Sequence, residues 1–242
     1  MVSGILFAAL AALGDLGGGA LVLWRTGRDR RALAAFTGFG AGFLVAVVML
    51  GMLPHAAAAA GPRNAFLAVL IGYLAVHLTQ HSLTPHFHFG EETHEEAMVS
   101  PGVGVYALVG LLPHSFFDGV AISAGFLESS GLGLLIFFGI LLHKVPTGVS
   151  LGSVMLASGN TGRQALAAVA AMGAATIVGA AVTPLFGAME DYGLPLAAGV
   201  TLYVAASNLV PEAQHERSWV VQGGLFAGVV AYFALTTMLP AH

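Results

Sequence analysis

The sequence contains no cysteine and very little charge. The absence of cysteine from all 242 residues excludes disulfide bonds and thiolate metal sites. Asp, Glu, Lys and Arg together make up 8% of the chain, against about 25% in a typical soluble domain. Hydrophobic residues make up 57%, and the mean hydropathy is +0.86. These proportions exclude a soluble enzyme, a nucleic-acid-binding protein and a disordered chain, and they indicate a polytopic membrane protein.

The sequence consists largely of long apolar runs. A helix needs about 20 mainly apolar residues to cross the bilayer core. The runs are continuous rather than alternating, which favours helices over a β-barrel. We expect an all-α bundle of eight transmembrane helices forming a single domain over residues 1–242, with spans at about 3–24, 32–54, 64–81, 102–127, 132–157, 164–188, 194–212 and 219–239.

The arginines in the loops predict the orientation of this bundle. With eight spans, only Arg63 falls on one side, and six arginines fall on the other, namely Arg25, Arg28, Arg30, Arg31, Arg163 and Arg217. Basic loop residues favour the cytoplasmic side. We therefore expect a multi-pass protein of the cell membrane, in bacteria the inner membrane, with both termini outside the cytoplasm.

The longest polar stretch separates the third span from the fourth. Residues 82–101 contain three histidines and four glutamates, and the predicted orientation makes this segment a cytoplasmic loop. Histidine-rich tracts bind metal ions readily but with little selectivity. The loop either collects metal ions or is an ordinary solvated segment, and the sequence favours neither interpretation.

The fourth and fifth spans carry a concentrated set of polar groups at membrane depth. An ionisable side chain there is expensive to bury and indicates a functional site by default. His114 and Asp118 in the fourth span are four residues apart and share a helix face, as do His143 and Thr147 in the fifth. Two imidazoles and a carboxylate suit zinc and similar divalent ions.

We therefore predict that His114, Asp118 and His143 bind a metal ion. The remaining polar groups of the two spans are candidates for an accessory site, namely Ser115, Lys144 and Thr147. The alternative is a buried hydrogen-bonded network in which Asp118 pairs with Lys144 and the two histidines pair with each other.

The segments PHSFFDG at 113–119 and HKVPTG at 143–148 resemble the paired metal-binding motifs of the ZIP family of divalent-metal transporters. The eight-span layout, the external termini and the histidine-rich loop agree with this resemblance. NLVPEA at 208–213 is similar to part of the seventh helix of the family. The resemblance implies inward movement of Zn²⁺ or another divalent transition metal, with His114 and Asp118 matching the ligands of the fourth helix and His143 the first polar position of the fifth.

The fifth span departs from the family pattern. ZIP proteins commonly have a second carboxylate where this chain has Thr147, and Lys144 occupies a neighbouring polar position. Adjacent dications repel strongly unless carboxylates screen them, so we expect one metal ion rather than two. Lys144 would then supply a fixed positive charge in place of the second ion and pair with Asp118 when the metal is absent. Asp15, in the first span, is a further carboxylate for which the sequence shows no partner.

Polar residues toward the cytoplasmic ends of the third and seventh spans form a candidate exit pathway, consisting of His77, His81, Asn208 and Glu212. Asn208 and Glu212 are four residues apart and share a helix face. The alternative for this group is an ordinary polar helix end.

The expected function is passive or proton-influenced transport of a divalent metal ion, because the chain has no G-x-x-x-x-G-K-S/T motif for ATP. The helices that bear the ion would rock against the rest and expose it alternately. Two other classes remain open: a membrane-embedded zinc-dependent hydrolase, disfavoured because H-E-x-x-H is absent, and a metal sensor that does not transport. The expected partners are the metal ion and the lipid bilayer, with no nucleic acid. The glycine-rich helix faces suit either a homodimer or internal packing.

Overall fold

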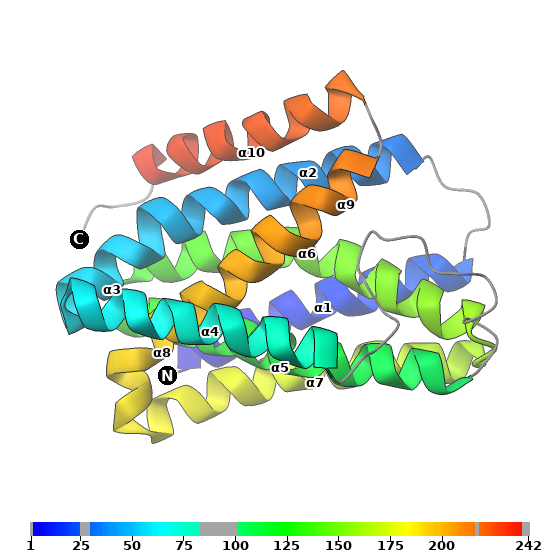
Figure 1. Ribbon diagram of the computed structural model, residues 1–242, viewed down its shortest axis with the longest axis horizontal. Coiled ribbons are helices and arrows are strands. Elements are labelled where there is room, and N and C mark those ends of the chain that lie inside the picture. Colours follow the sequence, from blue (N-terminus) through cyan, green and yellow to red (C-terminus); the bar gives the residue numbers. More distant parts are fainter. Residues whose placement is uncertain (1, 25–29, 83–100, 216–217, 239–242) are drawn as a thin grey trace.

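A computed structural model describes residues 2–24, 30–82, 101–215 and 218–238. Residues 83–100 of the predicted cytoplasmic loop lie outside this part of the chain. Within the described residues every regular element is a helix, and the helices run roughly along the long axis of the molecule (Figure 1).

The helices of the described residues form eight rods, two of which contain an internal π-helix. In chain order the rods are α1 (Val2–Trp24); α2 (Arg30–Ala46), continued by the π-helix η1 (Val47–Met52) and by α3 (Leu53–Ala60); α4 (Pro62–Ser82); α5 (Pro101–Glu128); α6 (Ser130–Ala157); α7 (Gly162–Val182), continued by the 3₁₀ turn η3 (Thr183–Leu185); α8 (Gly187–Tyr203), continued by the π-helix η4 (Val204–Leu209) and by α9 (Val210–His215); and α10 (Trp219–Met238).

Seven of the rods contain a stretch that is long and apolar enough to cross a membrane. The rod outside this set is α4, whose C-terminal turns carry the polar residues His77, Gln80 and His81. Its surface is nevertheless apolar, with six exposed large side chains, Phe66, Leu67, Leu70, Ile71, Leu74 and Leu78. The predicted helical membrane bundle is confirmed, and α4 occupies the place of its third span.

Helix starts follow from local capping chemistry. The Ser129 hydroxyl accepts a hydrogen bond of 3.1 Å from the Leu132 amide at the start of α6. Thr161 and Gln164 form a capping box at the start of α7. Pro101 begins α5, where a residue without an amide hydrogen leaves no hydrogen bond unmade. These caps set where the rods begin, and therefore which residues reach the middle of the bundle.

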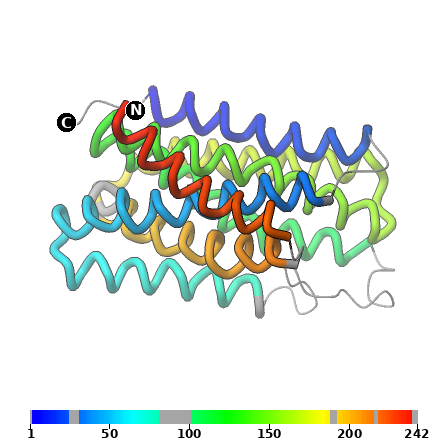
Figure 2. Tube along the Cα trace, turned by 90° about the horizontal axis from the view of Figure 1, so that it is seen from above, coloured from blue at the N-terminus to red at the C-terminus, as the bar shows by residue number. Residues whose placement is uncertain are grey.

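The rods form two groups that also touch each other. Helices α1, α5, α6 and α7 pack against one another, whereas α2 packs along α10 and α4 along α8; α5 also contacts α8, and α6 contacts α2. The start of α1 and the end of α10 lie at the same end of the bundle, as an even number of rods requires (Figures 1 and 2).

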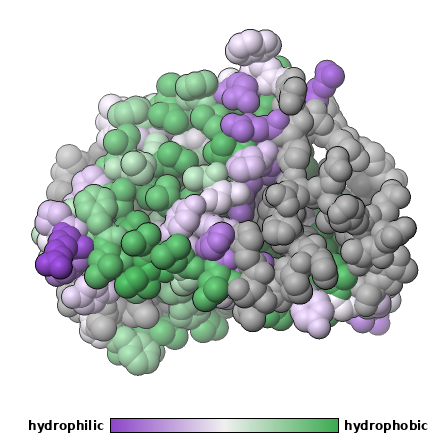
Figure 3. Space-filling model, in the orientation of Figure 1, coloured by the Kyte–Doolittle hydropathy of each residue, from purple (hydrophilic) through white to green (hydrophobic). Residues whose placement is uncertain are grey.

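The exterior is apolar and the interior contains charge. Hydrophobic side chains cover much of the face seen in Figure 3, and α10 exposes Phe226, Val230 and Phe233. An exposed apolar surface of this extent fits contact with lipid rather than with water. By contrast, Asp15 and Lys144 are fully buried. This distribution is the reverse of that in a soluble protein, and it places ionisable groups inside the bundle.

Candidate metal site

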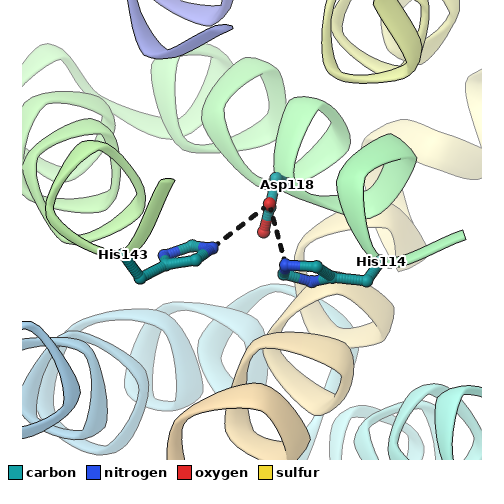
Figure 4. A group of neighbouring side chains, drawn as sticks. All are labelled: His114, Asp118 and His143. Carbon is teal, nitrogen blue, oxygen red and sulfur yellow. Dashed lines mark hydrogen bonds and ion pairs between the residues drawn. The ribbon is translucent and has the colours of Figure 1, made fainter. Parts of the chain in front are cut away.

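Helices α5 and α6 bring three buried ligand residues together. His114 and Asp118 lie one turn apart on α5, and His143 lies on α6; their exposed fractions are 1%, 0% and 1%. Asp118 lies between the two imidazole rings (Figure 4). Its Oδ2 atom is 3.3 Å from Nε2 of His114 and 3.3 Å from Nε2 of His143. One ligand atom from each residue lies within 4.8 Å of the others. The structure therefore assembles the three residues predicted as metal ligands.

The ring of His143 is oriented by its own helix. Its Nδ1 atom lies 3.2 Å from the Gly139 carbonyl oxygen, to which an Nδ1–H group donates. Its Nε2 atom is also within hydrogen-bonding distance of Asp118 Oδ2, at 3.3 Å. When Nδ1 holds the proton, Nε2 has a lone pair that can bind a cation. A tetrahedral zinc site with bonds of about 2.0–2.2 Å separates neighbouring ligand atoms by about 3.3–3.6 Å. The separation of His143 Nε2 and Asp118 Oδ2, 3.3 Å, therefore suits two ligands of one cation.

The other two ligand residues have unpaired polar atoms. Within the described residues, neither ring nitrogen of His114 has a hydrogen-bond partner, because its approach to Asp118 lacks hydrogen-bond geometry. The Oδ1 atom of Asp118 is also buried without a hydrogen-bond partner there. Buried polar atoms are normally paired, so such orphans need an explanation. A bound divalent ion would provide one, with three protein ligands and an open position for water or release.

The Lys144 ammonium lies beside these ligands and is fully buried. Its Nζ atom is 3.1 Å from Oδ2 of Asp118 and 3.1 Å from Oδ2 of Asp15. It also donates hydrogen bonds to Thr176 Oγ1 at 2.9 Å and to Ser115 Oγ at 3.2 Å. The expected pairing of Lys144 with Asp118 is present, and it coexists with the approach of both histidines to the same carboxylate oxygen.

Two glycine contacts bring α1 and α7 within reach of this ammonium. A Cβ atom on Gly148 of α6 would overlap the Asp15 carbonyl oxygen of α1. A Cβ atom on Gly119 of α5 would overlap the Thr176 carbonyl oxygen of α7 in the same way. Small residues permit such close approach of helix backbones. The two crossings place the Asp15 and Thr176 side chains next to the metal ligands.

The structure separates the predicted accessory residues. Ser115 and Lys144 contact each other, whereas the Thr147 hydroxyl donates to the His143 carbonyl of its own helix at 2.8 Å. Asp15 and Thr176 contact Lys144 and were not predicted to do so. Asp15 is conspicuous in the sequence as an intramembrane carboxylate, but nothing in the sequence distinguishes Thr176 from any other helix threonine.

The candidate exit residues lie on another pair of rods. Asn208 of η4 donates a hydrogen bond of 3.2 Å to Gln80 of α4, and the His77 ring packs edge-on against Tyr203 at 5.8 Å between centroids. Glu212 is exposed on α9. The side chain of the remaining candidate, His81, lies outside the described part of the structure. The described residues thus place polar contacts between α4 and the rod of α8, η4 and α9.

A helical bundle with an apolar exterior and ionisable ligands at its centre defines a class of membrane protein that handles ions. The sequence profile of the family described as ZIP Zinc transporter matches residues 90–240, which is more than half of the chain. The chain therefore belongs to the ZIP zinc transporter family, as its motifs predicted. No individual curated protein gives a significant match. Membership makes the chain a divalent-metal transporter and not an enzyme, which excludes the hydrolase alternative.

Proposed function

We propose that the protein carries zinc or a related divalent transition metal toward the cytoplasm, with one ion held by His114, Asp118 and His143. The observation that carries this proposal is the convergence of three buried ligand atoms within 4.8 Å of one another. Imidazole and carboxylate together favour a transition metal over Mg²⁺ or Ca²⁺, which prefer oxygen ligands alone.

The incomplete ligand set fits transport better than permanent storage. Three protein ligands bind an ion less completely than the four of a structural zinc site. Conduction requires binding that is favourable enough to take up the ion and weak enough to release it. The proposed cargo is therefore a partly dehydrated ion that keeps or regains a water ligand at its open position.

Alternating access would involve the two groups of rods. The ligands come from α5 and α6, and the helices that hold Lys144 in place are α1 and α7. All four belong to one packing group. We propose that this group rocks against the other rods, so that the ion faces first one side of the membrane and then the other.

The inward direction is what the family resemblance implies, and the loop arginines predict which end of the bundle faces the cytoplasm. With both termini outside the cytoplasm, Asn208 and Glu212 would lie toward the cytoplasmic end of the rod that they share. We propose that His77, His81, Asn208 and Glu212 line the route by which the ion leaves. The cell membrane is the proposed location.

Uptake into liposomes that contain a fluorescent zinc indicator tests this function. The wild-type protein is expected to raise the internal zinc signal, and His114→Ala is expected to abolish the rise because it removes one of three ligands. Thr183→Val is a matched control, since Thr183 is buried but donates only to the Gly179 carbonyl of its own helix. Undiminished uptake by His114→Ala would contradict the proposed site. Tight zinc binding without flux would favour a sensor instead.

A further inference from the structure

The Lys144 ammonium is shared between two carboxylates. Asp15 on α1 and Asp118 on α5 each place an oxygen 3.1 Å from its Nζ atom, and all three side chains are fully buried. An ammonium group has three hydrogens to donate. The hydroxyls of Ser115 and Thr176 already accept two hydrogen bonds from it. The two carboxylates therefore compete for one cation.

Metal binding at Asp118 changes this competition. The Oδ2 atom of Asp118 faces both histidine Nε2 atoms and also the ammonium. An ion that binds at this oxygen draws its negative charge away from Lys144. A buried cation that loses its counter-charge is strongly destabilised, because water cannot replace that charge. Metal binding is therefore favourable only if the ammonium keeps another anionic partner.

Asp15 is placed to be that partner. Neither carboxylate oxygen of Asp15 has a hydrogen-bond partner within the described part of the chain, and its ion pair there is with Lys144. The tight crossing at Gly148 fixes the Asp15 backbone against α6, the helix that carries Lys144. The carboxylate is thus held at the ammonium independently of Asp118.

We propose that Asp15 is a positioning residue for metal binding, which retains the Lys144 ammonium when Asp118 turns to the incoming ion. The step is then an exchange of partners rather than the loss of one. With neutral histidines, two carboxylates and one ammonium give the empty site a net charge of −1, which attracts a cation. The proposal rests on the proposed function, since it takes His114, Asp118 and His143 as the metal ligands.

A double-mutant cycle tests whether Asp15 acts through Lys144. Zn²⁺ binding is measured by calorimetry on four purified full-length proteins: wild type, Asp15→Asn, Lys144→Met and the double variant. In the wild-type background, Asp15→Asn is expected to weaken Zn²⁺ binding by about 10- to 100-fold, the range for partners that orient a metal ligand. In the Lys144→Met background the same change is expected to alter binding by no more than about twofold, because no ammonium remains to be held.

Two outcomes overturn the proposal. An equal loss in both backgrounds means that Asp15 attracts the ion directly through its charge, and no loss in either background means that it has no role in binding. A purely structural role would lower the yield of folded protein without changing the zinc affinity of the folded fraction. Should Asp15→Asn fold poorly, Asp15→Ser removes the same charge with a smaller side chain, and the cycle is run with it.

Two comparisons separate this inference from the proposed function. Glu128→Gln removes an exposed carboxylate at the far end of α5, about 15 Å along the helix from Asp118, and is expected to leave zinc binding unchanged. His114→Ala reports on the metal site itself. If His114→Ala abolishes Zn²⁺ binding and Asp15→Asn does not weaken it, the proposed site stands and the role of Asp15 fails. If the wild-type protein binds no Zn²⁺, both fail.

Discussion

A single oxygen atom, Oδ2 of Asp118, is the point at which the two proposed histidine ligands and the Lys144 ammonium meet. Both histidine Nε2 atoms lie 3.3 Å from it and Nζ of Lys144 lies 3.1 Å away. A dication at this oxygen and an ammonium beside it repel each other, so Lys144 limits how much positive charge the site can accept. We therefore propose that the ammonium favours one metal ion per chain rather than two.

Removing the ammonium without filling its space should create a second cation site. Lys144→Ala would leave the carboxylates of Asp15 and Asp118 and the hydroxyls of Ser115 and Thr176 around the vacated volume. Oxygen ligands suit a harder ion. We expect the variant to bind one Mn²⁺ in addition to one Zn²⁺, measured as metal content per chain by mass spectrometry after gel filtration.

Lys144→Met is the control for this prediction. Methionine removes the charge but fills most of the same volume, so the metal content should stay at one ion. A Lys144→Ala protein that binds no additional Mn²⁺ would show that the oxygens around Nζ do not form a cation site.

The sequence predicted that His114 and Asp118 share a helix face, but not the full surroundings of Lys144. His114 and Asp118 are one turn apart on the same span, so their shared face follows from helix geometry alone. The contact of Asp15 with Lys144 depends on how two helices cross, which one-dimensional spacing does not determine. Thr147 is likewise four residues from His143. Its hydroxyl nevertheless donates to the His143 carbonyl of its own helix, a hydrogen bond that helix threonines often make.

The two π-helices are the most unusual elements of the fold. The π-helices η1 and η4 each contain six residues, and in each rod a proline follows the π-helix after one further residue, at Pro54 and Pro211. The Leu53 amide donates to the Val48 carbonyl, and the Val210 amide to the Ala205 carbonyl, as expected for i→i+5 bonding. Both lie in rods outside the group of α1, α5, α6 and α7. In proteins generally, π-helical turns are often found at functional positions.

Helix crossings give a sharper prediction at this scale. Gly148→Ala is expected to force α1 away from α6, because its Cβ atom would overlap the Asp15 carbonyl oxygen. Overpacking of this kind costs about 1–3 kcal/mol. We expect a lower unfolding temperature and weaker Zn²⁺ binding, measured by thermal denaturation and calorimetry.

Gly17→Ala on α1 is the matched control, because a Cβ atom there meets no atom within 4 Å. Alanine is the better helix former by about 1 kcal/mol, so this variant should be as stable as the wild type or more so. Equal stability of the two alanine variants would mean that the α1–α6 crossing has room to adjust.

The spans were predictable as elements, and their details were not. Apolar runs locate all eight rods and place most of their ends to within a few residues, because bilayer-length hydrophobicity is a strong signal. The second rod continues to Ala60, beyond its predicted end at about 54. Helix α8 begins at Gly187, before its predicted start at about 194. The π-helices have no signal of their own, since proline predicts a disturbed helix without specifying its form.

At the scale of the whole molecule, the fold places charge inside and hydrocarbon outside. Exposed leucines and phenylalanines on α4 and α10 face outward, while Asp15, Asp118 and Lys144 are sealed within the group of α1, α5, α6 and α7. If the ion binds at Asp118, the proposed rocking of one group of rods against the other is what would open the site to either side of the membrane.

The orientation of the bundle yields a prediction for both ends of the chain. The start of α1 and the end of α10 lie at the same end of the bundle, and the loop arginines predict that this end is outside the cytoplasm (Figure 2). Alkaline phosphatase fused to the C-terminus should be active and green fluorescent protein fused there should be dark, since the first matures only outside the cytoplasm and the second inside. The reverse pattern would invert the proposed direction of the exit pathway.

Lys144 is the only lysine in the sequence, and its side chain has no exposure to solvent. A reagent that acylates amines can therefore modify a lysine of this protein only when water and the reagent reach the metal site. Apart from the α-amino group at the chain start, which a separate peptide reports, each acylated chain records one opening of the bundle. The one buried lysine thus lets the natural sequence report its own opening chemically, with no engineered label.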